Sequence, residues 1–538
     1  MFYIKKILIT LIVGMMWVLT SCSDLTENPQ SLLTNQVLTS PSGFERTVNA
    51  TYQTLRNFYG RERGFNLTTF GTDIWRNGAD GNFKFFNLYD SELDSRTPGG
   101  QLQQVWSEFY EGINSANTVI ANAPAVDLDE GLKTQRIAEV RFLRAFYYFH
   151  LVNIWGDVPL KLEITTEVTT VVERTPIDAV YAAIIDDLQF AINTLATDAD
   201  QDQFGRATVE AAQHLLAKVL LTRGDQGDYA QAETLTESVI NSGSFRLLDD
   251  FAELWVPGNE RSDEAIFNVG YSSDEIVNSQ GNRSHLYFIM TYDEPAGMTR
   301  VKEQGRPWKR YRTTTFLANL YGQGDSRFDK TFKTFYRSND EVSIPEGPNG
   351  QKLWAVGDTA VWVPRRVVTQ QEKDSRPPIL IRGIDEWDGR SFPTLRKHID
   401  PNRATTNDPS GERDFQVFRL AETYLLAAEA EIMQNKLSEA ADHINAVRVR
   451  AAEPGAEAAI EISANDVDID LLLDERAREL AGEMKRWFDL KRTNKLIERV
   501  RLYNPDGAPN IQPFHRLRPI PQAEIDRATN DLPQNPGF

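Results

Sequence analysis

Two loop segments carry the aromatic and polar side chains best suited to holding a ligand. In the first segment, Trp75 lies between Gly71 and Gly78. The same segment supplies three side chains that can hydrogen-bond hydroxyl groups: Asp73, Arg76 and Asn77. An aromatic ring on a glycine-bounded polar loop gains little from packing, so the sequence predicts that the ring is exposed.

The second segment, Gly305 to Tyr311, contains Trp308, and Tyr292 precedes it in the chain. A sugar ring presents a flat C–H face that stacks on an aromatic ring, while its hydroxyls need polar partners. We therefore predict a carbohydrate site in which Trp75 and Trp308 stack on the ligand, with Tyr292 and Tyr311 as secondary platforms. The alternative is that these rings only pack their own loops.

The sequence contains no group of residues that predicts a catalytic site in the way these two segments predict a binding site. The chain has 77 Asp and Glu residues, so carboxylate pairs are abundant, but none lies in a recognisable glycosidase motif. The six histidines show no zinc-binding spacing, and His150 is predicted to be a core residue beside Phe146 and Phe149. No nucleophile elbow, phosphate-binding loop or dinucleotide fingerprint occurs. We predict a protein that is not an enzyme and binds no cofactor or metal.

One acidic segment resembles the start of a calcium loop, with Asp198, Asp200 and Asp202 at alternate positions. Loop position six is Gln203 where glycine is required, and position twelve is Val209 where glutamate is required. The segment is therefore interpreted as a solvated acidic turn.

The formal net charge of -19 argues against a nucleic-acid partner, because phosphate binding needs clustered Lys and Arg. A single cysteine excludes disulfides within the chain and thiolate zinc sites. That cysteine, Cys22, follows an N-terminal export segment.

A basic start and an apolar run from Ile7 to Leu19 are typical of a signal peptide. At 1.5 Å per residue the run spans about 20 Å, too short for the roughly 30 Å hydrocarbon core of a bilayer. The sequence Leu-Thr-Ser-Cys that ends at Cys22 resembles a bacterial lipobox. Residues 1–21 are thus predicted to be cleaved, Cys22 to carry a lipid anchor, and residues 22–40 to form a tether. An ordinary signal peptide is the alternative.

Residues 41–538 are predicted to form a single, mainly α domain. Helical periodicity covers about 41–250 and 415–500, an irregular insert with short β-like runs covers about 251–413, and the tail at 503–538 is Pro-rich. Two helix pairs, at 215–232 and 425–440, resemble tetratricopeptide hairpins.

A continuous helix is expected from Asp466 to Val500. On it, a core stripe would consist of residues three or four apart: Leu473, Ala477, Leu480, Met484 and Trp487. Glu475 would pair with Arg478 and Glu483 with Arg486, since they too are three residues apart. Glu479, Arg486 and Asp489 are predicted to be structural ion-pair residues.

Four segments, in the same order along the chain, resemble those of the SusD/RagB family of Bacteroidetes outer-membrane nutrient-binding lipoproteins: 105–117, 138–159, 472–492 and 519–538. The resemblance implies a SusD-like fold, in which four tetratricopeptide-like helix hairpins support a loop-rich lobe. In glycan-binding relatives, an early loop and the mid-chain insert build an aromatic arc. Trp75 and Trp308 occupy similar positions along the chain, although no motif fixes a residue-level match.

The resemblance also implies a function and a partner. Such a protein would bind an oligosaccharide or polysaccharide at the surface of the outer membrane and cap a SusC-like, TonB-dependent transporter. RagB-like members handle peptides, so peptide import is the first alternative. A surface enzyme that cleaves carbohydrate is the second.

Overall fold

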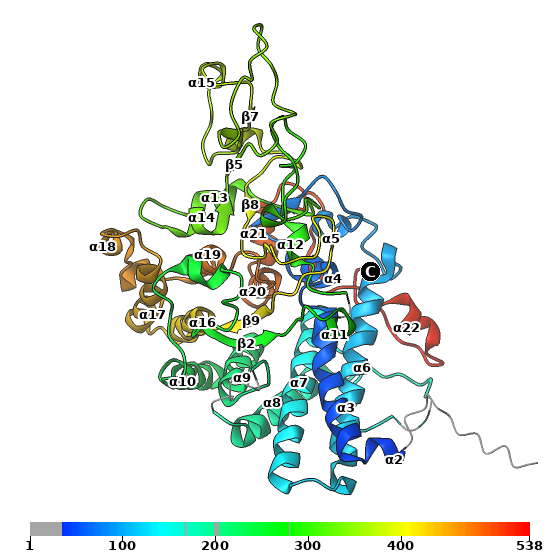
Figure 1. Cartoon of the computed structure of the whole chain (residues 1–538). Coiled ribbons are helices and arrows are strands. Elements are labelled where there is room, and N and C mark those ends of the chain that lie inside the picture. Colours follow the sequence, from blue (N-terminus) through cyan, green and yellow to red (C-terminus); the bar gives the residue numbers. More distant parts are fainter. Residues whose placement is uncertain (1–34, 166, 168, 198–203, 279) are drawn as a thin grey trace, which may run out of the picture.

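The computed structural model describes residues 35–165, 167, 169–197, 204–278 and 280–538 (Figure 1). The predicted signal segment, Cys22 and most of the tether lie outside these residues, as does the acidic turn at 198–202. A short helix, α2 (Asn35–Leu38), occupies the end of the segment predicted to be a tether. No helix in the described residues is long and apolar enough to cross a membrane.

Long helices form the body of the molecule, in the lower half of Figure 1. They are α3 (Pro41–Gln53), α6 (Gln101–Asn122), α7 (Glu130–Trp155), α8 (Ile177–Thr194), α9 (Val209–Arg223), α10 (Asp228–Ile240), α16 (Leu420–Met433) and α17 (Leu437–Arg450). The described helices pack in pairs, α3 with α6, α7 with α8, α9 with α10 and α16 with α17, and α10 packs on α16. The predicted mainly α fold is confirmed.

Local chemistry sets the ends of these helices. The Asp129 side chain caps α7 by accepting from the Leu132 N–H, and α7 ends at Gly156, whose φ is 75°. Thr208 caps α9 in the same way, and Gly224 ends α9 in the left-handed conformation. Both helices are therefore bounded by ordinary capping residues.

The predicted continuous helix over residues 466–500 is wrong. The structure has three shorter helices there: α19 (Ile469–Leu480), α20 (Arg486–Arg492) and α21 (Leu496–Tyr503). The chain breaks between α19 and α20 because Gly482 and Met484 have positive φ angles of 81° and 60°. The positive φ favours glycine at 482, and a Cβ there would lie 2.4 Å from the Leu395 side chain, which would have to shift.

The break changes the ion pairs. Glu475 pairs with Arg478 at 2.7 Å within α19, as predicted. Glu483 does not pair with Arg486; it accepts instead from Arg419 and Lys397, both at 2.7–2.8 Å. Arg486 reaches Asp73, at the other end of the chain.

The loop-rich lobe holds short strands. Antiparallel pairs are formed by β1 (Trp75–Asn77) with β3 (Tyr311–Thr313), β2 (Ala265–Val269) with β9 (Phe415–Arg419), and β4 (Phe332–Lys333) with β8 (Thr394–Leu395). A three-stranded sheet contains β5 (Phe335–Arg337), β6 (Thr359–Trp362) and β7 (Leu380–Ile381). This sheet and α15 (Gln370–Asp374) project from the top of the molecule in Figure 1.

The remaining described helices are shorter. They are α4 (Glu62–Thr68), α5 (Phe85–Leu88), α11 (Glu275–Asn278), α12 (Ser284–Tyr287), α13 (Thr315–Leu320), α14 (Arg327–Thr331), α18 (Glu457–Ile460) and α22 (Gln522–Arg527). The main hydrophobic core runs beneath both parts and contains the side chains of Trp106, Trp155 and Trp487. His150 is buried, as predicted, and its ring nitrogens hydrogen-bond the Tyr59 hydroxyl and the Phe146 carbonyl.

Candidate ligand-binding site

The two segments predicted to form the site meet in the structure. β1 pairs with β3, so that Trp75 lies opposite Thr313 and Asn77 lies opposite Tyr311. Beyond the ladder, the Gly78 N–H donates to the Arg310 carbonyl at 2.9 Å. An early loop and the mid-chain insert are thus neighbours.

The predicted exposure of Trp75 and Tyr311 is wrong. Trp75 is 2% exposed, with its ring centroid 4.8 Å from that of Phe288. Tyr311 is fully buried and donates to Asn66 Oδ1 at 2.6 Å. Neither ring faces solvent, so neither offers a stacking surface to a ligand.

The flanking glycines explain the error. A Cβ on Gly71 would lie 2.3 Å from the Tyr89 hydroxyl, and a Cβ on Gly78 would lie 2.0 Å from the Lys309 carbonyl oxygen. These glycines permit close packing of one chain segment on another. Their presence around Trp75 marks a tightly packed crossing and not an open loop.

Tyr292 and Asp73 are also buried, contrary to their predicted roles. The Tyr292 ring stacks on Tyr336 with centroids 4.8 Å apart, and its hydroxyl donates to the Gly305 carbonyl at 2.8 Å. Asp73 accepts from Arg486 at 2.6 Å and from Arg499 at 2.9 Å. Burial would raise the pKa of Asp73, but the two guanidinium groups hold the pKa below its usual value. Asp73 is therefore occupied by structural ion pairs.

Of the predicted site residues, Trp308, Arg76 and Asn77 remain partly accessible. Trp308 is half-buried, and the guanidinium carbon of Arg310 lies 4.9 Å from its ring centroid. The Arg76 side chain pairs with Asp506 at 2.6 Å, and the Asn77 main-chain N–H donates to the same carboxylate. Trp308 is thus the one predicted stacking ring with an accessible surface.

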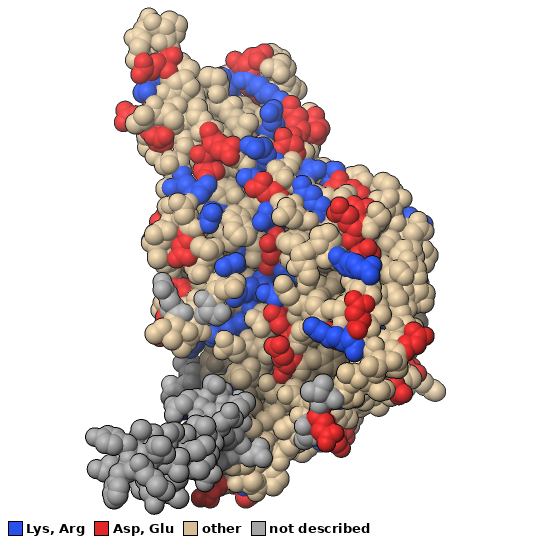
Figure 2. Space-filling view, turned by 90° about the vertical axis from the view of Figure 1, so that its right-hand side faces the viewer, with Lys and Arg blue, Asp and Glu red and all other residues tan. Residues whose placement is uncertain are grey.

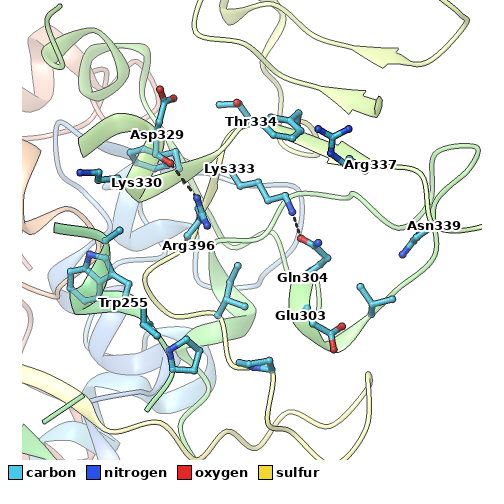
Figure 3. Close-up of a pocket in the computed structure, with 18 of the residues that line it drawn as sticks. Trp255, Glu303, Gln304, Asp329, Lys330, Lys333, Thr334, Arg337, Asn339 and Arg396 are labelled. Carbon is cyan, nitrogen blue, oxygen red and sulfur yellow. Dashed lines mark hydrogen bonds between the residues drawn. The ribbon is translucent and has the colours of Figure 1, made fainter. Parts of the chain in front are cut away.

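A broad cleft of about 1160 Å³ opens elsewhere in the lobe (Figure 3). One wall is the 3₁₀ turn Phe251–Trp255 with the following Val256 and Pro257, and another is the run from α14 through β4 to β5. The segments 298–304 and 396–401 complete the cleft.

The cleft combines apolar faces with hydrogen-bonding groups. Trp255 is half-buried at one side, and Phe335 is 45% exposed. Between and around them lie side chains with amide, hydroxyl, carboxylate or cationic groups: Glu303, Gln304, Asp329, Lys330, Lys333, Thr334, Arg337, Asn339 and Arg396. This composition suits a ligand with flat apolar faces and many hydroxyl groups.

Sequence reasoning missed the aromatic residues of this cleft, because Phe335 and Tyr336 are adjacent aromatic residues whose exposure differs only in the folded strand. Phe335 and Arg337 are exposed while Tyr336 between them is buried, which is the alternation of a strand with one solvent face. Trp255 precedes Val256, Pro257 and Gly258 in an irregular stretch, where burial could not be judged from sequence.

One cluster in the described residues has the types that bind metals. His443 lies with one ring nitrogen 2.9 Å from Glu431 and the other 3.0 Å from Glu237. Burial would lower the pKa of His443, but the two carboxylates raise it. Because both ring nitrogens face carboxylates, a protonated imidazole bridging them accounts for the cluster without a metal.

Family models match both halves of the chain. The model described as "SusD family" matches residues 263–538, more than half of the sequence. The chain belongs to the SusD family. A second model, described as "Starch-binding associating with outer membrane", matches residues 27–221.

Relatives of this SusD-family chain extend over most of its length. It is 28% identical over 564 aligned residues to SusD-like protein P2 of Formosa agariphila, covering 99% of this chain and 100% of the relative. It is 25% identical to the starch-binding protein SusD of Bacteroides thetaiotaomicron, covering 74% of this chain and 72% of that protein.

Solved structures have the same fold. A laminarin-binding SusD-like protein superposes with a TM-score of 0.70 at 24% identity, covering 93% of this chain and 100% of the other. Surface glycan-binding protein A of Bacteroides thetaiotaomicron, in complex with laminarihexaose, superposes with a TM-score of 0.70 at 20% identity, covering 92% and 100%.

The C-terminal residues that resemble the family signature are structural, as predicted. Glu479 is fully buried and accepts from Arg419 and Arg450 at 2.6 Å and from Arg327 at 2.9 Å. Asp489 pairs with Arg476 at 2.9 Å. These buried ion pairs join the insert, α17, α19 and α20.

Proposed function

We propose that this protein binds an oligosaccharide at the cell surface and delivers it to a SusC-like, TonB-dependent transporter, without cleaving it. Family membership supports the proposal, together with relatives described as starch-binding and laminarin-binding. The solved complex of a relative with laminarihexaose supports the same class of ligand.

We place the binding site in the cleft. The observation that carries this placement is the presence of two accessible aromatic rings, Trp255 and Phe335, within one solvent-open cleft rich in hydrogen-bonding side chains. Trp308 does not line the cleft, and its contact with a ligand is kept as a separate proposal that rests on its partial exposure.

Calorimetry with an identified glycan ligand tests the placement. Trp255→Ala and Phe335→Ala should each weaken binding by about 1–3 kcal/mol, which is about five- to hundredfold, because each removes one stacking surface of the cleft. Phe190→Ala is the matched control, since Phe190 is a partly buried aromatic residue on α8, outside the cleft. Unchanged affinity in both cleft variants would show that the site lies elsewhere.

The same protein preparations distinguish glycan binding from the two alternatives, glycan cleavage and peptide import. Incubation with the glycan should leave it intact, and products on chromatography would restore the enzyme hypothesis. Binding of peptides in place of glycans would favour RagB-like import.

Anchoring and partnership are tested by cell fractionation. We expect wild-type protein in the outer membrane, and gentle detergent extraction should recover it with a large β-barrel transporter. Cys22→Ala should be released in soluble form, because acyl chains contribute about 0.8 kcal/mol per buried CH₂ group to membrane binding. Retention of that variant in the membrane would argue against a lipid anchor at Cys22.

A further inference from the structure

Basic side chains gather in the cleft of a protein whose formal net charge is -19. Lys330, Lys333, Arg337 and Arg396 line it, against the carboxylates of Glu303 and Asp329. On the molecular face shown in Figure 2, by contrast, basic and acidic side chains are interspersed.

Three of these cations have no acidic partner. Lys330 pairs with Asp250 at 2.9 Å. Among the ion pairs of the described residues, none includes Lys333, Arg337 or Arg396. Arg337 donates to the Gly357 carbonyl at 2.9 Å, and Arg396 donates to the main-chain carbonyl of Asp329 at 3.3 Å.

Lys333 and Arg396 are held close to each other by the β4–β8 ladder. Lys333 pairs with Thr394 in the ladder, and Arg396 follows two residues later. Lys333 donates to Gln304 Oε1 across the cleft, and its Nζ lies 4.5 Å from the Tyr336 ring centroid (Figure 3). Two cations on one wall with neutral partners repel each other and lack compensation from an acid.

Removal of an unpaired ammonium from water is unfavourable. Partial burial, and then the nearby Arg396, lowers the pKa of Lys333 to about 8. A lysine in this position without a carboxylate partner can gain charge compensation from an anion that enters the cleft.

We propose that the glycan bound in the cleft is acidic, and that Lys333 and Arg396 bind its carboxylate or sulfate groups. This inference rests on the proposed function, because it names the ligand class of the same site. A guanidinium group binds either anion through two parallel hydrogen bonds, and an ammonium group adds a compact charge. Trp255, at the left of Figure 3 with Arg396 between it and Lys333, would stack on a neighbouring sugar ring.

Pairs of glycans that share a backbone and differ in charge test whether the charge of the ligand determines its affinity. Calorimetry would compare oligogalacturonates with their methyl esters, and carrageenan oligosaccharides with the same oligosaccharides after chemical desulfation. We expect one acidic probe to bind at least tenfold more tightly than its neutral counterpart. The pair that shows the difference identifies the anion as uronate or sulfate. Increasing the salt concentration should reduce that difference, because salt screens exposed charges.

Variants of Lys333 and Arg396 test whether these two side chains cause the tighter binding of acidic glycans. Lys333→Met and Arg396→Gln should each weaken acidic binding about tenfold, in line with one charged hydrogen bond. Arg527→Gln is the control, because it removes one charge from α22, which contributes no residue to the cleft. Thermal unfolding should change little in the three variants, since Lys333 and Arg396 have no ion pair to lose and Arg527 is largely exposed where it pairs with Glu524.

The outcomes are distinguishable. Equal binding of acidic and neutral probes, unaffected by Lys333→Met and Arg396→Gln, would overturn the acidic-ligand inference and leave glycan binding standing. Absence of binding to any glycan, with binding to an acidic peptide such as oligoglutamate, would overturn both proposals.

Discussion

Glu479→Gln is expected to lower the free energy of unfolding by about 3–5 kcal/mol, because it leaves buried guanidinium groups without their shared carboxylate. Arg327, Arg419 and Arg450 all donate to Glu479, which has no exposed surface. Denaturant titration followed by circular dichroism measures the change. The amide keeps the size of the side chain, so the loss reports charge and not a cavity.

The effect should depend on pH. Burial raises the pKa of Glu479, but the three arginines lower it to about 2, below the ordinary value of 4.5. A depressed pKa stabilises the fold above pH 4.5, and that contribution is lost as the pH falls towards 2. The difference between wild type and Glu479→Gln should therefore shrink in acid. Glu439→Gln, at an exposed site on α17, should have little effect, and an equal loss there would contradict the argument.

Trp75→Ala should also lower the free energy of unfolding by about 3–5 kcal/mol, because it opens a large cavity in the core. The ring is almost fully buried and packs against Phe288 and Phe332. Thermal unfolding and calorimetry on the same sample separate the two interpretations of this residue. We expect a lower melting temperature and, below it, glycan affinity equal to that of wild type.

The half-buried Trp308 provides the comparison for Trp75. Trp308→Ala should cost less stability, because part of its ring is already in water. If Trp75→Ala kept its stability and lost binding, the burial of Trp75 in the native protein would be disproved.

Periodicity predicted the helical body because its helices obey simple rules. α9 is capped by Thr208 before its first residue and by Gly224 after its last, so turn-forming residues stand where the pattern stops. The same method failed at Gly482, since one glycine in an unbroken apolar stripe does not reveal a left-handed turn. The approach of Leu395, which further favours glycine there, comes from a distant part of the chain.

The binding site was harder to predict for a related reason. Exposure of an aromatic residue is a property of tertiary structure, and glycines around Trp75 accompany close packing as readily as an open loop. Trp255 lies in an irregular segment whose sequence gives no periodicity. The Lys333 ammonium group reaches the amide of Gln304 and forms no ion pair with the neighbouring Glu303, and local sequence does not encode that choice.

The Asp73 ion pairs have a consequence for how the chain folds. Asp73 is separated by 413 residues from Arg486 and by 426 from Arg499. Contacts of such long range are slow to form, because a long loop of chain must close before they stabilise anything. The N-terminal loop therefore cannot form these ion pairs until the C-terminal helices have been synthesised, and a nascent chain that ends before Arg486 lacks both arginines that pair with Asp73. We expect truncation before α20 to abolish cooperative folding of the whole chain, including the helices that lie far from the cut.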